Sequence, residues 1–247
     1  MLKALAHIAL ALLLTVLTQL GGLAWLAALA FRRRALAFAL IYTALSVSAL
    51  WLAPQFGRVA LPCLSGDTLQ MQSPLFCALN RQYVVPELES VLQDFAADMA
   101  KRAPDTKTRV LDANFPFIAG FPLLPHLSHH DGRKADLAFF YQDEGGYLAG
   151  AARSPIGYFA FEDGPTNCPK AFPSLRWDMG WLQPLWPAYS LDEPRMRAAL
   201  TWLSADARVG KAFIEPHLAA SLGITSPKIR FQGCRAARHD DHIHLQL

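Results

Sequence analysis

The sequence predicts an α+β domain, built on a small antiparallel sheet with flanking helices, that follows an N-terminal hairpin of two transmembrane helices. Three observations lead to this prediction. Two long apolar runs fill residues 1–54, helix-like and strand-like segments alternate along the rest, and all four cysteines lie beyond the apolar runs. The chain has 247 residues, of which 53% are hydrophobic and only 17% are charged. That composition argues against a disordered protein and suits a membrane segment.

The two apolar runs are Ala4–Phe31 and Ala35–Pro54, and each reaches the roughly 20 residues that a helix needs to cross a bilayer. Arg32–Arg34 separates them, and short arginine-rich loops stay in the cytoplasm. We therefore expect a hairpin in the inner membrane, with its turn inside, both ends outside, and residues 55–247 in the periplasm. One alternative is a signal peptide cleaved near Ala28–Ala30, which leaves the second run as a single anchor. A buried pair of core helices is disfavoured, because the arginines have no acidic neighbour.

The basic excess of the chain belongs to its first fifth. The whole chain has 23 basic and 20 acidic residues, and residues 1–54 contain four of the basic and none of the acidic residues. Residues 55–247 therefore contain 19 basic and 20 acidic residues. The nearly neutral remainder gives no electrostatic reason to expect nucleic acid as a partner.

The cysteines fit an oxidising compartment. Four cysteines in an extracytoplasmic domain suggest two disulfides, with three possible connectivities. We favour Cys63–Cys77 with Cys168–Cys234, because the first pair is close in sequence. Four free thiols are the alternative, and a four-cysteine zinc site is disfavoured because the C-x₂-C spacing is absent from the sequence.

Residues 55–107 are expected to connect the membrane segment to the core and to hold one helix. That helix is Glu87–Arg102, because Pro86 is favourable in a first turn and the apolar residues that follow recur at helical spacing. Residues 108–247 are expected to form the core, so that 55–247 make one compact domain. Its expected strands are Thr108–Asn114, Asp136–Tyr141, Gly210–Glu215 and His242–Leu247, with one or two more within Gly145–Gly164. Its expected helices are Glu193–Ser204, capped by Asp192 or Ser190, and Pro216–Leu222, ended by Gly223.

Six of the eight histidines lie in two clusters, at 126, 129 and 130 and at 239, 242 and 244. In the first cluster Asp136 opens the apolar run Leu137–Tyr141. A buried carboxylate needs a partner, and a divalent metal is one. An ordinary salt bridge between a loop histidine and an aspartate at a strand edge is the alternative. His130 and Asp131 fit surface positions better than ligands.

In the second cluster, side chains that alternate along a strand place His242 and His244 on one face. Two histidines and one carboxylate form the three-ligand set of catalytic zinc, which leaves a position for water. We therefore nominate His129, Asp136 and His244 as Zn²⁺ ligands, with the zinc on the face of the sheet. His242 is nominated as the general base or as a hydrogen-bond donor to the oxyanion.

These residues form two motifs, S-H-x-x-G-x-x-x-D at Ser128–Asp136 and H-x-x-H-x-H at His239–His244. The pair resembles the penicillin-insensitive murein endopeptidases, of the lysostaphin and D-Ala-D-Ala metallopeptidase superfamily, over roughly residues 108–247. The resemblance implies that His129, Asp136 and His244 bind zinc, that His242 is catalytic, and that His239 matches an additional upstream histidine of the endopeptidases. His239 is therefore a further catalytic candidate, with a role in lining the site as the alternative. Asp241 stands where the dipeptidase branch carries a catalytic glutamate, so either Asp241 or His242 could be the base. His126 also has a counterpart, and either binds a second metal or orients a loop.

The expected function is a membrane-anchored zinc metallopeptidase that hydrolyses amide bonds in peptidoglycan stem peptides or cross-links. Its expected partners are the peptidoglycan peptide and the inner membrane. The alternative is a non-hydrolytic peptidoglycan-binding module with a structural zinc. The tryptophans at 177, 181 and 186 either line a substrate groove or form a buried structural cluster.

Overall fold

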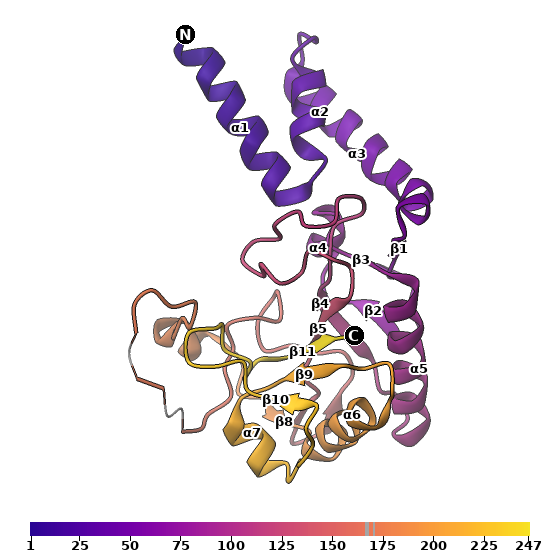
Figure 1. Cartoon of the computed structure of the whole chain (residues 1–247), viewed down its shortest axis with the longest axis vertical. Coiled ribbons are helices and arrows are strands. Elements are labelled where there is room, and N and C mark those ends of the chain that lie inside the picture. The colour runs from indigo at the N-terminus through magenta and orange to yellow at the C-terminus, as the bar shows by residue number, and fades with distance from the viewer. Residues whose placement is uncertain (166–167, 170) are drawn as a thin grey trace.

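The computed structural model describes residues 1–165, 168–169 and 171–247. Three N-terminal helices stand together at one end of the molecule, and a mixed α+β domain forms the rest (Figure 1). The expected α+β class is therefore confirmed, while the N-terminal segment differs from the expected hairpin.

The first apolar run is two helices rather than one. Helix α1 (Leu2–Thr18) ends at Gln19, whose φ of 64° breaks the helix, and α2 (Gly21–Ala28) folds back along it. A Cβ on Gly22 would lie 1.8 Å from Thr15 Oγ1, so only glycine permits this approach of the two helices. The Gly21–Gly22 pair inside the apolar run was therefore a turn and packing signal.

This turn also corrects the expected placement of the N-terminus. Helix α3 (Arg34–Leu52), extended by the 3₁₀ turn η1 (Ala53–Phe56), runs from the arginine turn to the domain. The N-terminus lies near the arginine end of α3, opposite the domain (Figure 1). Arg34 Nη1 lies 3.4 Å from His7 Nε2 of α1. The continuous segment Arg34–Phe56 is long and apolar enough to cross a membrane.

The domain is built on a six-stranded sheet. The central pairings are antiparallel, as expected, but the outermost strand on each side pairs in parallel, so the sheet is mixed. The C-terminal strand is central, which places its two histidines in the middle of the sheet. In spatial order the strands are β10 (Ile229–Arg230), β9 (Lys211–Phe213), β11 (His242–Gln246), β5 (Lys134–Ala138), β4 (Thr108–Asp112) and β2 (Leu69–Met71).

Two helices cover one face of this sheet and leave the other to the histidines. Helices α5 (Pro86–Arg102) and α6 (Glu193–Ala205) share a hydrophobic core with Ile243 and Leu245 of β11. Because side chains alternate along a strand, His242 and His244 face the other way. Asp192 caps α6 by accepting from Arg195 N–H at 3.0 Å, as expected.

The segment 55–107 is part of the domain, not a separate connection. Strand β2, which lies in the segment expected to hold only a helix, pairs with β4, and α5 contributes six buried residues to the core. Helix α4 (Pro74–Ala78) and the small sheet of β1 (Val59–Ala60) and β3 (Tyr83–Val84) complete this region. Residues of 55–107 and of 108–247 therefore share one hydrophobic core.

The remaining elements are short. The expected strand Asp136–Tyr141 is split, because β5 ends at Ala138 and Tyr141 begins β6 of a second sheet. That sheet consists of β6 (Tyr141–Asp143), β7 (Gly146–Leu148) and β8 (Ser190–Leu191), and the 3₁₀ helix η2 (Gly180–Leu185) and helix α7 (Pro216–Ser221) complete the chain. The two favoured disulfides, Cys63–Cys77 and Cys168–Cys234, are both confirmed.

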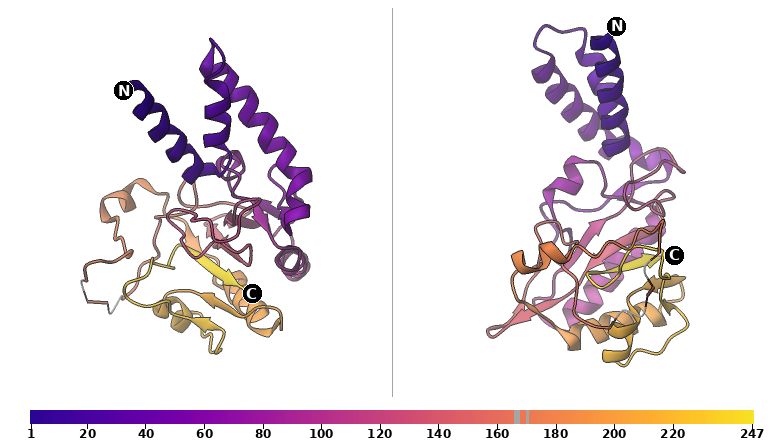
Figure 2. Two further views of the ribbon diagram at one scale, coloured as in Figure 1. Left: turned by 45° about the horizontal axis from the view of Figure 1, so that its top comes forward. Right: turned by 90° about the vertical axis from the view of Figure 1, so that its left-hand side faces the viewer.

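The turn between α1 and α2 and the neighbouring helix α3 meet the domain through buried and half-buried polar groups, which we term the junction cluster: Thr18, Gln19, Tyr42, Ser46 and Asn80. Asn80 Nδ2 donates to Tyr42 Oη at 3.0 Å and to Ser46 Oγ at 3.1 Å. The backbone N–H of Phe117 donates to Gln19 Oε1 at 3.0 Å. Side-by-side placement of the turn and the 115–130 loop is visible in both views of Figure 2.

Candidate metal centre

Strand register brings the two sequence motifs together. Strands β5 and β11 pair in antiparallel register, and the pairing sets His244 directly opposite Asp136. Directly opposed residues in such a pair have their Cβ atoms within about 5.5 Å of each other. Two side chains more than 100 positions apart in sequence are thus fixed as neighbours by backbone hydrogen bonds.

The three predicted ligands converge. His129 Nε2 lies 3.1 Å from His244 Nδ1 and 3.3 Å from Asp136 Oδ1, and that oxygen lies 2.7 Å from His244 Nδ1. A tetrahedral zinc with bonds of about 2.0–2.1 Å separates its ligand atoms by roughly 3.3 Å. We call His129, Asp136 and His244 the three-ligand group.

The hydrogen bonds around this group fix the protons of its two imidazoles. His129 Nδ1 donates to the carbonyl of Ala113 at 2.7 Å, so in the neutral ring Nε2 carries no proton. His244 Nε2 accepts from the amide nitrogen of Gln246 at 2.7 Å, so in the neutral ring the proton is on Nδ1, which lies 2.7 Å from Asp136 Oδ1. A cation at this point would take the place of that proton and would have two imidazole nitrogens and a carboxylate oxygen within reach. The residues present therefore fit a metal ion.

His242 stands beside the group with one nitrogen unpartnered. Its Nδ1 is hydrogen-bonded to Asp241 Oδ1, while Nε2 lies 3.7 Å from Asp136 Oδ1 and is buried without a hydrogen-bond partner among the described residues. Both oxygens of Asp241 are engaged, because Oδ2 accepts from the Phe159 N–H at 2.6 Å. Of the two candidate bases, His242 is the one whose reactive atom is free.

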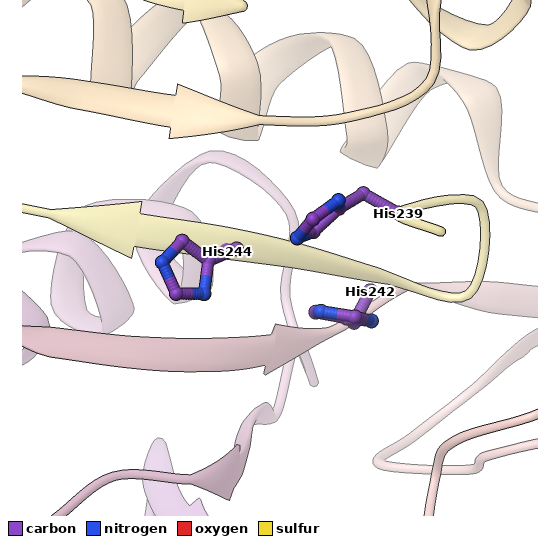
Figure 3. A group of neighbouring side chains, drawn as sticks. All are labelled: His239, His242 and His244. Atoms are coloured by element: carbon purple, nitrogen blue, oxygen red, sulfur yellow. The ribbon is translucent and has the colours of Figure 1, made fainter. Parts of the chain in front are cut away.

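His239 completes the C-terminal histidine cluster. It precedes β11 and turns toward the same side as His242 and His244 (Figure 3). The side chain is buried and its Nδ1 has no partner among the described residues. Possible ligand atoms lie within 4.8 Å of one another in two groups, His239–His242–His244 and His126–His129–Asp136. The structure thus brings together every site residue that the sequence nominated.

The charges of these groups depend on one another. Burial alone would raise the pKa of Asp136, but His129 and the other histidines around it hold that pKa well below its usual value. Burial is also the largest influence on His242, yet Asp136 and Asp241 together raise its pKa to about 9. In His244 burial prevails and lowers the pKa to about 4, which favours the neutral ring that a metal ligand needs.

Two features behind Asp136 were not predicted from the sequence. Asp112 on β4 is opposite Asp136, fully buried, and receives hydrogen bonds from both Nε and Nη2 of Arg81. Arg81 also donates to the carbonyl of Leu124 at 2.9 Å, in the loop that carries His126 and His129. Tyr158 donates to Asp136 Oδ2 at 2.7 Å. Neither feature belongs to a recognisable motif, and neither had a sequence signal.

A cleft of about 220 Å³ opens onto the metal centre. Its walls come from four loops, around residues 125–128, 158–161, 175–177 and 232–239, and they are largely apolar and aromatic. Trp177 lines it and stacks on Phe159 at 6.3 Å between ring centroids. Trp186 instead supports the wall, donating from Nε1 to the carbonyl of Phe159, and Trp181 is 73% exposed. The three tryptophans are therefore not one buried cluster.

Comparison of the chain with protein-family models and with curated proteins finds no match. The resemblance to murein endopeptidases therefore rests on the two motifs alone. What the geometry itself establishes is a buried group of histidines and an aspartate that could hold a metal ion.

Proposed function

We propose that this chain is a membrane-anchored zinc metallopeptidase that hydrolyses amide bonds of peptidoglycan stem peptides or cross-links. The observation that carries the proposal is the three-ligand group, with one aspartate oxygen and two imidazole nitrogens within 3.3 Å of one another and with His244 lining a cleft. Zinc is favoured by this mixture of nitrogen and oxygen ligands and by their number. The peptidoglycan substrate is inferred from the resemblance of the motifs.

Bound zinc would supply an activated water nucleophile at neutral pH and would polarise the amide carbonyl. The chain provides the groups that handle protons. Asp241 fixes the orientation of the His242 ring through Nδ1, which leaves Nε2 facing the centre. In its neutral form His242 would accept the proton of the attacking water and pass it to the leaving amine, and in its charged form it would donate to the oxyanion.

His239 would act beside His242 rather than in its place. Their ring centroids are 4.9 Å apart, and burial, followed by the neighbouring His242 and His244, lowers the pKa of His239 well below its usual value. A neutral imidazole there can donate a hydrogen bond to the substrate without adding a second positive charge. Asp241 would serve as the residue that orients His242, because neither of its oxygens is free.

The location proposed is the inner membrane, with the metal centre in the periplasm. Helix α3 is long enough to span the bilayer, and its arginine end, which favours the cytoplasm, is opposite the domain. The two disulfides agree with an oxidising compartment. In this arrangement the N-terminus is also cytoplasmic, since it lies at the arginine end.

The test uses the full-length chain in detergent. We expect about one equivalent of zinc per chain and release of new peptide ends from purified muropeptides. His129→Ala should lose both properties, and the matched control His130→Ala, at the exposed neighbouring histidine, should retain both. Absence of zinc from the parent protein, or a His129→Ala protein that digests sacculi as well as the parent, would contradict the proposal.

A second candidate function, a non-hydrolytic binding module with a structural zinc, is favoured by one observation. His239, His242 and His244 also offer ligand atoms within 4.8 Å of one another, so a fourth protein ligand is within reach of the ion. A structure with zinc distinguishes the two functions. Four protein ligands indicate the structural role, whereas three ligands and a solvent molecule beside His242 indicate the hydrolase.

A further inference from the structure

The two oxygens of Asp136 have different surroundings. Oδ1 faces the nitrogens of His129 and His244, whereas Oδ2 points away and lies 2.7 Å from the Tyr158 hydroxyl and 2.9 Å from His126 Nδ1. Asp136 itself is completely buried. Its outer oxygen is thus occupied by neighbouring polar groups before any metal is considered.

Tyr158 is held firmly in this position. Its ring lies 4.9 Å from that of His126 and 5.0 Å from that of His242, and its carbonyl accepts from the Ser154 hydroxyl at 2.6 Å. Gly157 precedes it with a φ of 82°, and a Cβ there would lie 2.2 Å from Leu111 Cδ2. The turn can therefore be made only by glycine, and it aims the tyrosine at the metal centre.

The same loop holds both carboxylates of the site. The side chain of Tyr158 bonds to Asp136, and the backbone N–H of the next residue, Phe159, bonds to Asp241. Phe159 has a φ of 65°, which is costly for a residue with a bulky side chain. Strained backbone persists where the surrounding structure demands it, and here it directs the N–H toward Asp241.

We propose that Tyr158 is a positioning residue that keeps Asp136 a one-oxygen ligand and thereby keeps one coordination position open. An oxygen that already accepts a hydrogen bond from a hydroxyl and lies 2.9 Å from an imidazole nitrogen is a poorer metal ligand than its partner. Three single-atom protein ligands leave the fourth tetrahedral position for solvent or substrate, whereas a two-oxygen aspartate would fill it. The inference rests on the proposed metal function and names a residue outside both sequence motifs.

The test is Tyr158→Phe in the full-length chain, which removes the hydroxyl and keeps the ring. Zinc affinity is measured by chelator competition, and the visible spectrum of the cobalt-substituted protein reports coordination number. We expect the cobalt spectrum to shift toward higher coordination, because the freed oxygen can bind the metal, and the zinc affinity to change by about 10- to 100-fold, the size of effect that outer hydrogen bonds have. Tyr147→Phe, which loses a hydroxyl that accepts from Lys107 N–H away from the site, should change neither.

Equal affinity and an unchanged spectrum in Tyr158→Phe would overturn the inference and leave the proposed function standing. A parent protein that binds neither zinc nor cobalt would overturn both. If Tyr158→Phe does not fold, His126→Phe decides, because it removes the other partner of Oδ2. A spectral shift in the same direction supports the inference, and an unchanged spectrum contradicts it.

Discussion

Two polar clusters among the described residues, the candidate metal centre and the junction cluster, differ in their chemistry. In the junction cluster the side chains are uncharged amides and hydroxyls, and donors largely face acceptors, as Asn80 does with Tyr42 and Ser46. In the candidate metal centre an aspartate oxygen and two imidazole nitrogens face one another. The first cluster is uncharged and joined by hydrogen bonds, whereas the second is a group of histidines and an aspartate that could hold a metal ion.

Unpaired buried atoms have different consequences in the two clusters. Both clusters contain buried atoms without a partner among the described residues, Gln19 Nε2 in one and His242 Nε2 in the other. An unpaired amide costs stability and offers no chemistry, whereas an unpaired imidazole nitrogen beside a metal site can bind or move a proton. We therefore expect changes at the junction to alter stability only, and changes at the centre to alter metal binding and activity.

The largest expected effect is at Asp136. Asp136→Ala removes the carboxylate that lies between the imidazoles of His129 and His244. Metal affinity should fall by more than the roughly 100-fold that loss of a hydrogen-bond partner of a ligand costs. Asp131→Ala is the matched control, since that aspartate lies just before β5 and pairs with Lys134, the first residue of the strand. Metal content after dialysis and chelator competition are the measurements. Retention of zinc by Asp136→Ala at parental affinity would remove the distinction between the two clusters.

His242→Ala should separate metal binding from catalysis. Loss of a general acid–base residue lowers turnover by about 10²- to 10⁴-fold, while the three-ligand group and the zinc content remain. The measurement is kcat on muropeptides, beside metal analysis of the same sample. Loss of zinc together with activity would show that His242 is a ligand, which favours the structural role of the metal.

The third effect concerns the buried ion pair of Arg81 and Asp112, which lies behind Asp136. Arg81→Met leaves Asp112 buried without its partner, and breaking a buried pair costs about 3–5 kcal/mol. The double variant Arg81→Met with Asp112→Leu should recover much of that loss, because an apolar pair replaces the buried charges. Chemical unfolding in detergent gives both values. A single variant as stable as the parent would show that the ion pair is not needed to hold the ligand loop.

The smallest effect is expected in the junction cluster. Ser46→Ala removes one hydrogen bond from Asn80, which keeps its bond to Tyr42, so the free energy of unfolding should fall by about 1 kcal/mol. Zinc affinity and turnover should not change. Altered zinc affinity in Ser46→Ala would instead mean that the helices and the metal centre are energetically coupled.

Much of the fold could be read from local patterns. Helices α5 and α6 and strands β4, β9 and β11 follow from apolar periodicity and capping, which depend on near neighbours in sequence. Short elements such as β2 were not predicted, because a three-residue strand in a proline-rich stretch is defined by its pairing with β4 rather than by its own pattern. The break at Gln19 was not predicted because both sides of it are equally apolar.

The sequence by itself determined the ligand types, their two clusters, the apolar N-terminal segment and the cysteines available for pairing, since each depends on residue identity and spacing. The tertiary structure alone decided that His244 stands opposite Asp136, that Asp241 is occupied while His242 is free, and that Tyr158 and Arg81 support the site. It also decided that the first apolar run folds back on itself. These are contacts between distant segments, and they are set by strand register and close packing, which no single stretch of the chain encodes.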